Sequence, residues 1–561
     1  MKLLIKPWIK SPTKQLMKPL VCSTLLLSIM LSLLGCQQTQ ITFTPTAKPQ
    51  LPVFDKLQGA PEIAALDYQA SAPAERLVLS PELKVQLGQE PKQELELYLF
   101  NDTPSGLTHL SLVAYSKAPM ANLDVLVAAF REKRRWIVQQ SSLACAETLS
   151  IRVSMHSLTI SIDCPYSPSS ARSATKLLMQ FWQAESPDRV GSFDEIDIAN
   201  VRRQLKLAKH INAYSGAEID QVWAKKLLGE QHVYNQALND KALADELDLT
   251  KLNQVRDTIL AQSKWAFFAN NSLERAFDKQ PELDFNNSPE QGFNKQLERG
   301  FNKQLERGSH KEPEQSSALL PMLNKQFETI ATQQSQTLTP FPTAKNHTAP
   351  SNDNKTLYLI DAPASVQTQV RIGYPLDASD NNIDSIQDCK LLASWLGRSF
   401  SGRLYYDLRE VRGLTYGIYG RCFNNPLSRT LKFYGSTKLE HTGAFISGVL
   451  DHLALAAQTP ASNAEVTALK NYLTSQKMLY QANYHNVELD SIKRLILGYQ
   501  PEQEQQTSAR LAGLTPEQLQ QIARSIFTNT PYIVIRGDMD KIKSDLTDKL
   551  PEWTITEVSA D

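Results

Sequence analysis

Histidines are the side chains that could most directly hold a catalytic metal in this chain, and their spacing argues against a zinc helix. Two imidazoles four residues apart lie on one helix face and can share a zinc ion, while a neighbouring glutamate activates the metal's water. The nine histidines stand at positions 109, 156, 210, 232, 310, 347, 441, 452 and 485, and no two are four apart. We therefore expect no metal site on this chain.

Other catalytic patterns are also missing. The sequence contains no Gly-x-Ser-x-Gly and no P-loop. Asp451-His452 falls on a predicted helix and is interpreted as a solvated pair. The charged run 131–135 is interpreted as a solvated helix end rather than a nucleic-acid patch. Lys plus Arg equals Asp plus Glu at 59 each, so no net charge draws the chain to nucleic acid or anionic lipid.

The N-terminus predicts export and lipid anchoring. Residues 1–19 carry five lysines and no acidic residue, and an apolar run from Leu20 to Leu34 follows. The run is shorter than the roughly 20 residues that a membrane span needs, so residues 1–35 are predicted to be a signal peptide. Leu33-Leu34-Gly35-Cys36 resembles a bacterial lipobox, which implies lipidation of Cys36. Gln37 then implies an outer-membrane lipoprotein that faces the periplasm.

Four cysteines follow Cys36: Cys145, Cys164, Cys389 and Cys422. No CxxC occurs, so neither a zinc ribbon nor a thioredoxin-like site is expected. Alternating residues around 149–155 and 158–162 predict a hairpin joined around His156-Ser157. Pairing residue 155 with 158 would leave Cys145 four residues from the partner of Cys164, which is too far for a bond at about 3.3 Å per residue. We therefore predict that Cys145 and Cys164 are not bridged.

Hydrophobic periodicity predicts mixed structure on both sides of a polar segment. At 561 residues the length suggests about three or four domains. Residues 36–56 are a predicted tether, and 57–275 a first ordered half. Strands are predicted at 95–100, 107–115, 357–360, 366–374 and 532–535, and helices at 122–136, 170–184, 196–228 and 386–401. Two capping boxes, at Ser462-x-x-Glu465 and Thr515-Pro516-Glu517-Gln518, predict helix starts.

Residues 276–354 differ from their surroundings. An eight-residue sequence at 292–299 is repeated identically at 300–307 within Gln-, Asn-, Thr- and Pro-rich sequence. Two copies are too few for a solenoid. We therefore predict a long disordered linker between two mixed α/β halves, the second covering 355–561.

The most informative segment is 400–417, Phe-Ser-Gly-Arg-Leu-Tyr-Tyr-Asp-Leu-Arg-Glu-Val-Arg-Gly-Leu-Thr-Tyr-Gly. It resembles the signature in the C-terminal half of pitrilysin/insulinase-type peptidases, where Arg-Leu, Leu-Arg-Glu and Gly-Leu-x-Tyr occur in this order. The flanking strands and the closing Val534–Asp538 agree in order, so the resemblance covers about 355–540. A weaker similarity extends over 57–275 and includes Gln231-His232-Val233-Tyr234. The resemblance implies an α+β, clamshell-like fold of two related halves.

The resemblance also implies roles for two side chains. Arg409 and Tyr416, seven residues apart, correspond to the family's arginine and tyrosine that face the zinc across a chamber. A guanidinium offers a rigid fork of donors to the carbonyls of an extended peptide. A phenol can donate to the oxyanion of the reacting peptide, which typically contributes a few kcal/mol. Gly413 would allow the turn between them.

An active member also needs His-x-x-Glu-His, and neither possible alignment supplies it. If the motif falls on 106–113, only His109 survives, with Leu112 and Val113 in place of Glu and His. If it falls on the helix 122–136, nothing survives. We prefer the second alignment because 107–115 alternates like a strand, and we interpret His109 as a surface or hairpin histidine.

Two functions remain open. The chain could be the substrate-gripping, non-zinc subunit of a peptidase whose homologous partner binds zinc, which makes it inactive alone and leaves its status as an enzyme undecided. Alternatively, it could be a lipid-anchored peptide-binding or scaffold protein without a catalytic partner. A zinc peptidase acting alone is disfavoured.

Overall fold

The computed structural model describes residues 83–86, 95–100, 107–165, 167–182, 195–237, 245–270, 352–376, 383–481, 483–499 and 501–559, together with Leu323 and Phe327. The predicted signal peptide, Cys36 and the tether lie outside the described residues. Among the described helices, none combines the length and apolar character that a bilayer crossing requires.

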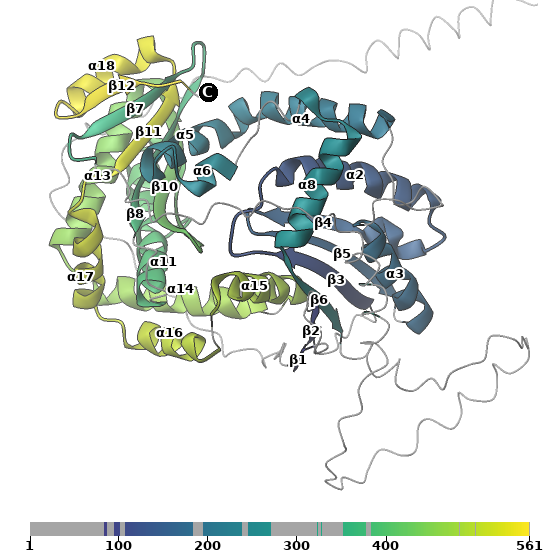
Figure 1. Ribbon diagram of the computed structural model, residues 1–561. Helices are drawn as coiled ribbons and strands as arrows, with labels where there is room; N and C mark the ends of the chain where they lie inside the picture. The colour runs from purple at the N-terminus through teal and green to yellow at the C-terminus, as the bar shows by residue number, and fades with distance from the viewer. Residues whose placement is uncertain are drawn as a thin grey trace, which may run out of the picture. The chain divides into compact units, whose positions relative to one another are not determined.

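A mixed sheet of six strands forms the first half, in the order β1-β2-β6-β3-β5-β4 (Figure 1). β2 and β6 run parallel, and the other neighbours are antiparallel. The predicted strands at 95–100 and 107–115 are confirmed with those bounds. The six strands are β1 (Leu83–Gln86), β2 (Leu95–Phe100), β3 (Leu107–Tyr115), β4 (Ser150–Ser154), β5 (Ser157–Pro165) and β6 (Lys264–Asn270).

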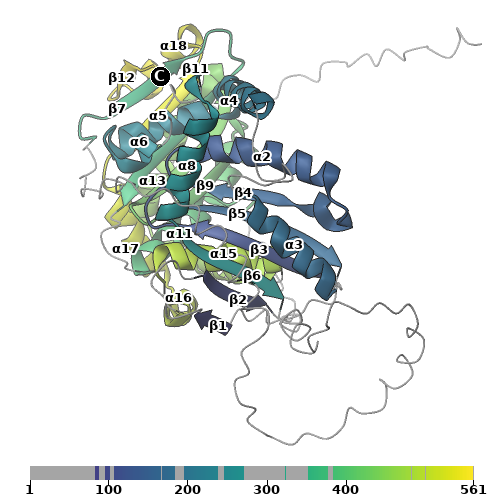
Figure 2. The ribbon, with the colours of Figure 1, turned by 45° about the vertical axis from the view of Figure 1, so that its right-hand side comes forward.

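Both faces of this sheet are apolar, so each needs a helical cover. Leu110, Leu112 and Ala114 of β3 point into a core shared with α2 (Leu123–Gln140), α3 (Pro168–Gln180) and α8 (Leu249–Gln262). Figure 2 shows α2 and α3 beside this sheet. Val113 and Tyr115 point to the opposite face and a separate core. Successive residues of a strand face opposite sides, which explains why β3 is buried almost throughout.

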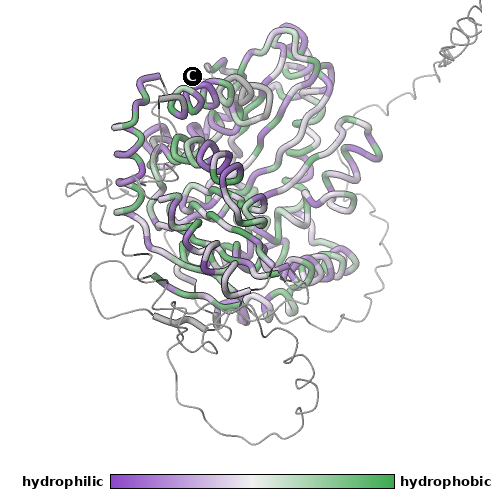
Figure 3. Tube along the Cα trace, turned by 90° about the vertical axis from the view of Figure 1, so that its right-hand side faces the viewer, coloured by the Kyte–Doolittle hydropathy of each residue, from purple (hydrophilic) through white to green (hydrophobic). Residues whose placement is uncertain are grey.

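A second six-stranded sheet forms the other half, in the order β12-β7-β11-β8-β10-β9. Its core is shared with α11 (Ile383–Gly397), α13 (Thr442–Gln458), α14 (Asn463–Gln481), α17 (Pro516–Phe527) and α18 (Met539–Lys549). In Figure 3 hydrophobic and hydrophilic residues interleave along the tube, as expected for amphipathic helices. The strands are β7 (Thr356–Asp361), β8 (Gln367–Leu376), β9 (Thr415–Asn425), β10 (Ser428–Lys438), β11 (Tyr532–Gly537) and β12 (Thr554–Glu557).

The two sheets share one plan. In each, the first long strand of the half pairs in parallel with the last long one, β2 with β6 and β7 with β11. The next strand pairs antiparallel with that last strand, and a hairpin completes the sheet. The predicted fold class, two related mixed α/β halves, is confirmed.

Each sheet is covered on its second face by a helix from the other half. Helix α5 (Ala217–Leu228) packs Val222, Trp223 and Leu227 against Tyr532 and Val534 of β11. Helix α15 (Tyr484–Leu497) packs Val487, Ile492 and Ile496 against the first sheet. Figure 1 shows α5 beside β11 and α15 beside β3 and β6. The sequence predicted the helical stretch that contains α5 but not its partner, and it predicted no helix at 484–497.

The predicted helical stretch 196–228 is divided at Gly216, where φ is +83°. α4 (Glu195–Ser215) ends there and α5 begins. A side chain at this φ would be strained, and a Cβ would lie 2.9 Å from a guanidinium nitrogen of Arg371. The glycine therefore lets the chain turn so that α5 reaches the second sheet.

Most of the predicted linker at 276–354 lies outside the described residues, with two exceptions in its interior. Leu323 and Phe327 are buried in the core of the first half, and the ring centroid of Phe327 lies 5.3 Å from that of Trp265. Part of this segment therefore belongs to the first half's core.

The prediction that Cys145 and Cys164 are not bridged is wrong. The two form a disulfide with their Cα atoms 5.1 Å apart, and Cys389 and Cys422 form a second with 5.5 Å. Two causes explain the error. The hairpin pairs Ser154 with Ser157, a register two residues from the predicted one. Residues Ala144–Thr148 then form a 3₁₀ helix, which advances about 2 Å per residue rather than 3.3 Å.

Candidate functional site

Residues 400–417 form helical turns followed by a strand at the sheet edge. α12 (Arg403–Tyr405) continues into the π-helical segment η3 (Tyr406–Val411), and β9 starts at Thr415. Gly413 has φ of +63°, a conformation that glycine adopts without strain, and joins η3 to β9. This turn places the residues before and after it side by side.

The structure brings the predicted site residues Arg409 and Tyr416 together. The guanidinium carbon of Arg409 lies 5.7 Å from the centre of the Tyr416 ring and 4.7 Å from that of Tyr405. Its Nε lies 3.4 Å from Oε1 of Glu410. The Arg409 side chain is 33% exposed and Tyr416 is 85% exposed. Both donors are therefore accessible at one surface.

β9 is the outermost strand of its sheet and pairs with β10 alone among the described strands. Tyr416 and Tyr419 are exposed on it. An edge strand presents backbone N–H and C=O groups to which an extended peptide can add as a further strand. Tyr416 thus lies on the edge strand itself, and Arg409 lies in η3, the helical segment just before it.

A buried ion pair anchors the start of this segment. Arg403 is fully buried, and its Nε and Nη2 lie 2.5 and 2.9 Å from the two carboxylate oxygens of Glu465. The indole N–H of Trp395 donates to the same carboxylate at 3.2 Å. Glu465 is also the glutamate of the predicted capping box at Ser462, and both hydrogen bonds of this box are present. The arginine of the Arg-Leu pattern is therefore a positioning residue.

Asp407 anchors the middle of the segment. Its Oδ2 lies 2.9 Å from Nε2 of His452 and accepts a 2.8 Å hydrogen bond from Nε of Arg412. Burial raises the pKa of Asp407, but the hydrogen bond and charge of His452 and the charge of Arg412 outweigh it, so the pKa is lowered. The interpretation of Asp451-His452 as a solvated pair is wrong for His452, which is fully buried because it faces the core side of α13.

We expect Asp407→Asn to destabilise the protein in a pH-dependent way. Since folding lowers the pKa of Asp407, its contribution is present above the unfolded pKa of about 4 and is lost as pH falls through the lower folded pKa. Urea unfolding should therefore separate wild type and variant at pH 6 and bring them together towards pH 2. An equal difference at both pH values would mean that the Asp407 charge contributes nothing.

The helix that would carry a zinc motif lacks the ligands. Residues 107–115 form β3, so an alignment on 106–113 would put the motif on a strand, and α2 is the helix that follows. α2 contains no histidine, and its Glu132 is paired with Arg135 and Gln204. These residues do not fit the zinc ion of an active peptidase of this type.

The interpretation of His109 as a surface or hairpin histidine is wrong. It is 1% exposed, with Nδ1 2.8 Å from Asp163 and Nε2 2.5 Å from Glu488. Burial lowers the pKa of His109, but the hydrogen bonds and charges of Asp163 and Glu488 raise it by a larger amount. The pKa is therefore above its ordinary value. The strand assignment was right, but Glu488 comes from α15, 379 residues away, so local sequence could not show that this face is covered.

The segment that resembles the family's His-Pro-Tyr lies against the other half. The Tyr234 hydroxyl lies 2.8 Å from Nε2 of His156 and accepts from the backbone N–H of Leu427 at 3.1 Å. His232 Nε2 lies 3.2 Å from the Leu427 carbonyl. These residues therefore connect the first half to the β9–β10 turn rather than facing Arg409.

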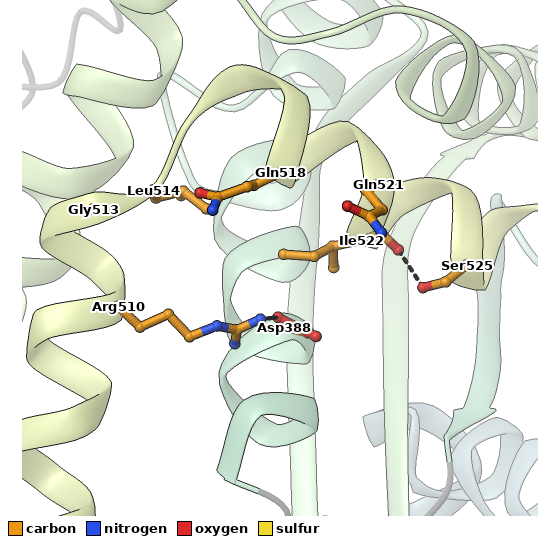
Figure 4. A pocket seen from close by; sticks show the side chains of 8 residues that line it. All are labelled: Asp388, Arg510, Gly513, Leu514, Gln518, Gln521, Ile522 and Ser525. Carbon is orange, nitrogen blue, oxygen red and sulfur yellow. Dashed lines mark hydrogen bonds and ion pairs between the residues drawn. The ribbon is translucent and has the colours of Figure 1, made fainter.

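A pocket among α11, α16 (Pro501–Gly513) and α17 lies apart from this site (Figure 4). Arg510 pairs with Asp388 at 2.6 Å on one wall, and Gln518 and Ile522 line another. Neither Arg409 nor Tyr416 lines it.

Comparison with known proteins finds solved structures that share this fold. Solved structures share the fold at low identity: a peptidase M16 inactive domain from Pseudomonas fluorescens (13% identity, 79% of this chain and 96% of that one, TM-score 0.57) and a protease from Helicobacter pylori (11%, 81% and 100%, 0.58). The periplasmic protease PqqL from Escherichia coli matches at 10% identity over 85% of this chain and 49% of its own, with a TM-score of 0.51.

The sequence itself matches one family model. Residues 314–473, which include the Arg409–Tyr416 segment, match the peptidase M16 inactive domain. The resemblance to the pitrilysin/insulinase type, in its non-zinc form, is thereby confirmed. The match begins inside the segment predicted as a linker. No curated protein matches the chain.

Proposed function

We propose that this chain is the substrate-gripping subunit of a two-chain peptidase whose zinc is held by a homologous partner. The observation that carries the proposal is the pairing of an exposed Arg409–Tyr416 site with an α2 helix that lacks histidine. Under this proposal the chain alone cleaves no peptide.

The chemistry of the site suits an extended peptide. A peptide strand added to the edge of β9 would run beside Tyr416, and the Arg409 fork would donate to its carbonyl oxygens. The Tyr416 phenol would donate to the oxyanion that develops on the cleaved carbonyl. Arg403–Glu465 and Asp407–His452 hold the segment so that these donors keep their places.

We further propose that the protein is anchored to the periplasmic side of the outer membrane through lipid on Cys36. Two disulfides join the four cysteines that follow Cys36, which fits an oxidising compartment. The fold is shared with a periplasmic protease. Acyl chains on one residue would hold the domain at the membrane without a spanning helix.

A second candidate is a lipid-anchored peptide-binding or scaffold protein without a catalytic partner. The same exposed edge and donors favour it, since binding an extended peptide needs no metal. It predicts peptide binding without cleavage in any combination of chains.

Purification of the lipidated protein from its native envelope, followed by mass spectrometry, distinguishes the two. We expect a homologue carrying His-x-x-Glu-His in the eluate, and peptide cleavage by the pair but not by this chain alone. If no such homologue is recovered and the chain still binds peptide, the subunit proposal is overturned. The peptide-binding or scaffold protein is then the function that remains.

A further inference from the structure

Three potential metal ligands converge where α15 covers the first sheet. They are His109 on β3, Asp163 on β5 and His485 on α15, and one ligand atom from each lies within 4.8 Å of the others. His109 and Asp163 are direct cross-strand partners. They lie on the face of the sheet opposite α2, because residues 110, 112 and 114 are the ones that point towards α2. This cluster is therefore separate from the position of the family's zinc motif.

The distances are close to those of a metal site. Nδ1 of His109 lies 2.8 Å from Oδ1 of Asp163, and Nε2 of His485 lies 3.8 Å from Oδ2 of the same carboxylate. Ligands about 2.0–2.2 Å from a tetrahedral zinc ion lie roughly 3.3 Å from one another. The observed separations lie on both sides of this value, so small side-chain movements would complete the geometry.

The surroundings orient His109 as metal-binding histidines are oriented. Its second nitrogen, Nε2, lies 2.5 Å from Glu488, which is fully buried. Glu488 is in turn held by Arg152 and by the hydroxyl of Ser111 at 3.2 Å. A carboxylate on the second ring nitrogen holds a proton on Nε2, so that Nδ1, which faces Asp163 at 2.8 Å, is the nitrogen that would release its proton when a metal binds. Nδ1 of His109 therefore faces the other proposed ligands, and Glu488 holds the ring from its opposite side.

The other two ligands are also held in place. The Tyr484 hydroxyl donates to Oδ1 of Asp163 at 3.0 Å. Asn483 caps α15 by accepting from the backbone N–H of His485 at 2.9 Å, which fixes the helix start. Nδ1 of His485 is buried without a hydrogen-bond partner among the described residues. The other nitrogen of this imidazole, Nε2, faces Asp163 and is the candidate ligand atom.

The cluster is open on one side. His109 is buried, but the side chains of Asp163 and His485 are 24% and 34% exposed. An ion could enter from this side, and water could complete its coordination. Two imidazoles and one carboxylate form a ligand set that zinc accepts, whereas calcium and magnesium prefer oxygen alone.

We propose that His109, Asp163 and His485 bind a zinc ion that ties α15 to the first sheet. The site has a structural role and is independent of peptide cleavage. Because its ligands come from both halves of the chain, bound zinc stabilises the packing of α15, and the ion raises the stability of the folded state by mass action.

Zinc titration of the chelator-stripped full-length protein tests this. We expect one zinc ion per chain by calorimetry and elemental analysis, a higher Tm with zinc, and slower hydrogen exchange in residues 484–497. His485→Ala and Asp163→Asn should each weaken zinc binding by about 10-fold or more. His441→Ala, which changes a histidine outside the cluster, should bind zinc like wild type, and so should Arg409→Ala.

Two results would overturn the proposal. One is the absence of saturable zinc binding by the wild type, which would make the cluster an ion-pair network only. The other is unchanged zinc affinity in both His485→Ala and Asp163→Asn, which would place the ion elsewhere. Cobalt substitution gives a second readout, since loss of the tetrahedral Co²⁺ absorption in these variants, but not in His441→Ala, identifies the ligands directly.

Discussion

Tyr416→Phe lowers peptide cleavage by the reconstituted two-chain peptidase by about 10²–10³-fold, and Arg409→Ala lowers it at least as far. Removal of one preformed oxyanion donor typically has an effect of this size. Tyr416 is 85% exposed, so its hydroxyl contributes little to the packing of the free chain. The loss should therefore appear in kcat with Tm unchanged. Arg409→Ala should raise KM as well, because its fork binds substrate carbonyls.

Tyr419→Phe is the matched control, since Tyr419 lies on the same strand and is less exposed. It should retain most of the activity. Equal losses in Tyr416→Phe and Tyr419→Phe would point to a general disturbance of β9. No loss in Tyr416→Phe would remove the phenol from the mechanism.

Glu465→Gln destabilises the folded protein by about 3 kcal/mol. Glutamine preserves the capping box at Ser462 but removes the charge that neutralises fully buried Arg403. An uncompensated buried charge costs about 3–5 kcal/mol, and Glu465 keeps some contact with solvent, which favours the lower end. Chemical denaturation of wild type and variant at neutral pH measures the difference.

Glu517→Gln is the control for Glu465→Gln, because it makes the same chemical change in the first turn of the exposed face of α17. It should change the free energy of unfolding by less than about 0.5 kcal/mol. A similarly small effect at Glu465 would show that the Arg403 pair does not anchor the segment before Arg409.

Local sequence rules predicted the elements of the fold well. β2 and β3 follow from alternation and apolar content, and their bounds are as predicted. The capping box at Thr515 is present, with both of its hydrogen bonds. The turn at Gly413 and the proximity of Arg409 to Tyr416 followed from the resemblance, because seven residues with a glycine between them return the chain to the same place.

Long-range partners could not be predicted in this way. Trp223 has the periodicity of a core residue, but nothing nearby indicates that its core is the second sheet. The Cys145–Cys164 disulfide depends on a 3₁₀ turn at Ala144–Thr148 and on a hairpin register two residues from the predicted one, neither of which the local sequence indicates. His109 and His485 are 376 residues apart, so a search for histidines at helical spacing cannot find them. The Trp223 contact and the His109–His485 contact depend on packing between the halves, whereas the Cys145 turn lies within the first half.

Photo-crosslinking from position 416 tests the central claim most directly. A benzophenone amino acid at this position, in the purified lipoprotein with a labelled unfolded peptide, should capture the peptide in preference to the same probe at exposed Leu479. Unlabelled peptide should compete, and Arg409→Ala should reduce the yield. Equal capture from positions 416 and 479, or none from 416, would contradict a peptide-gripping edge at β9.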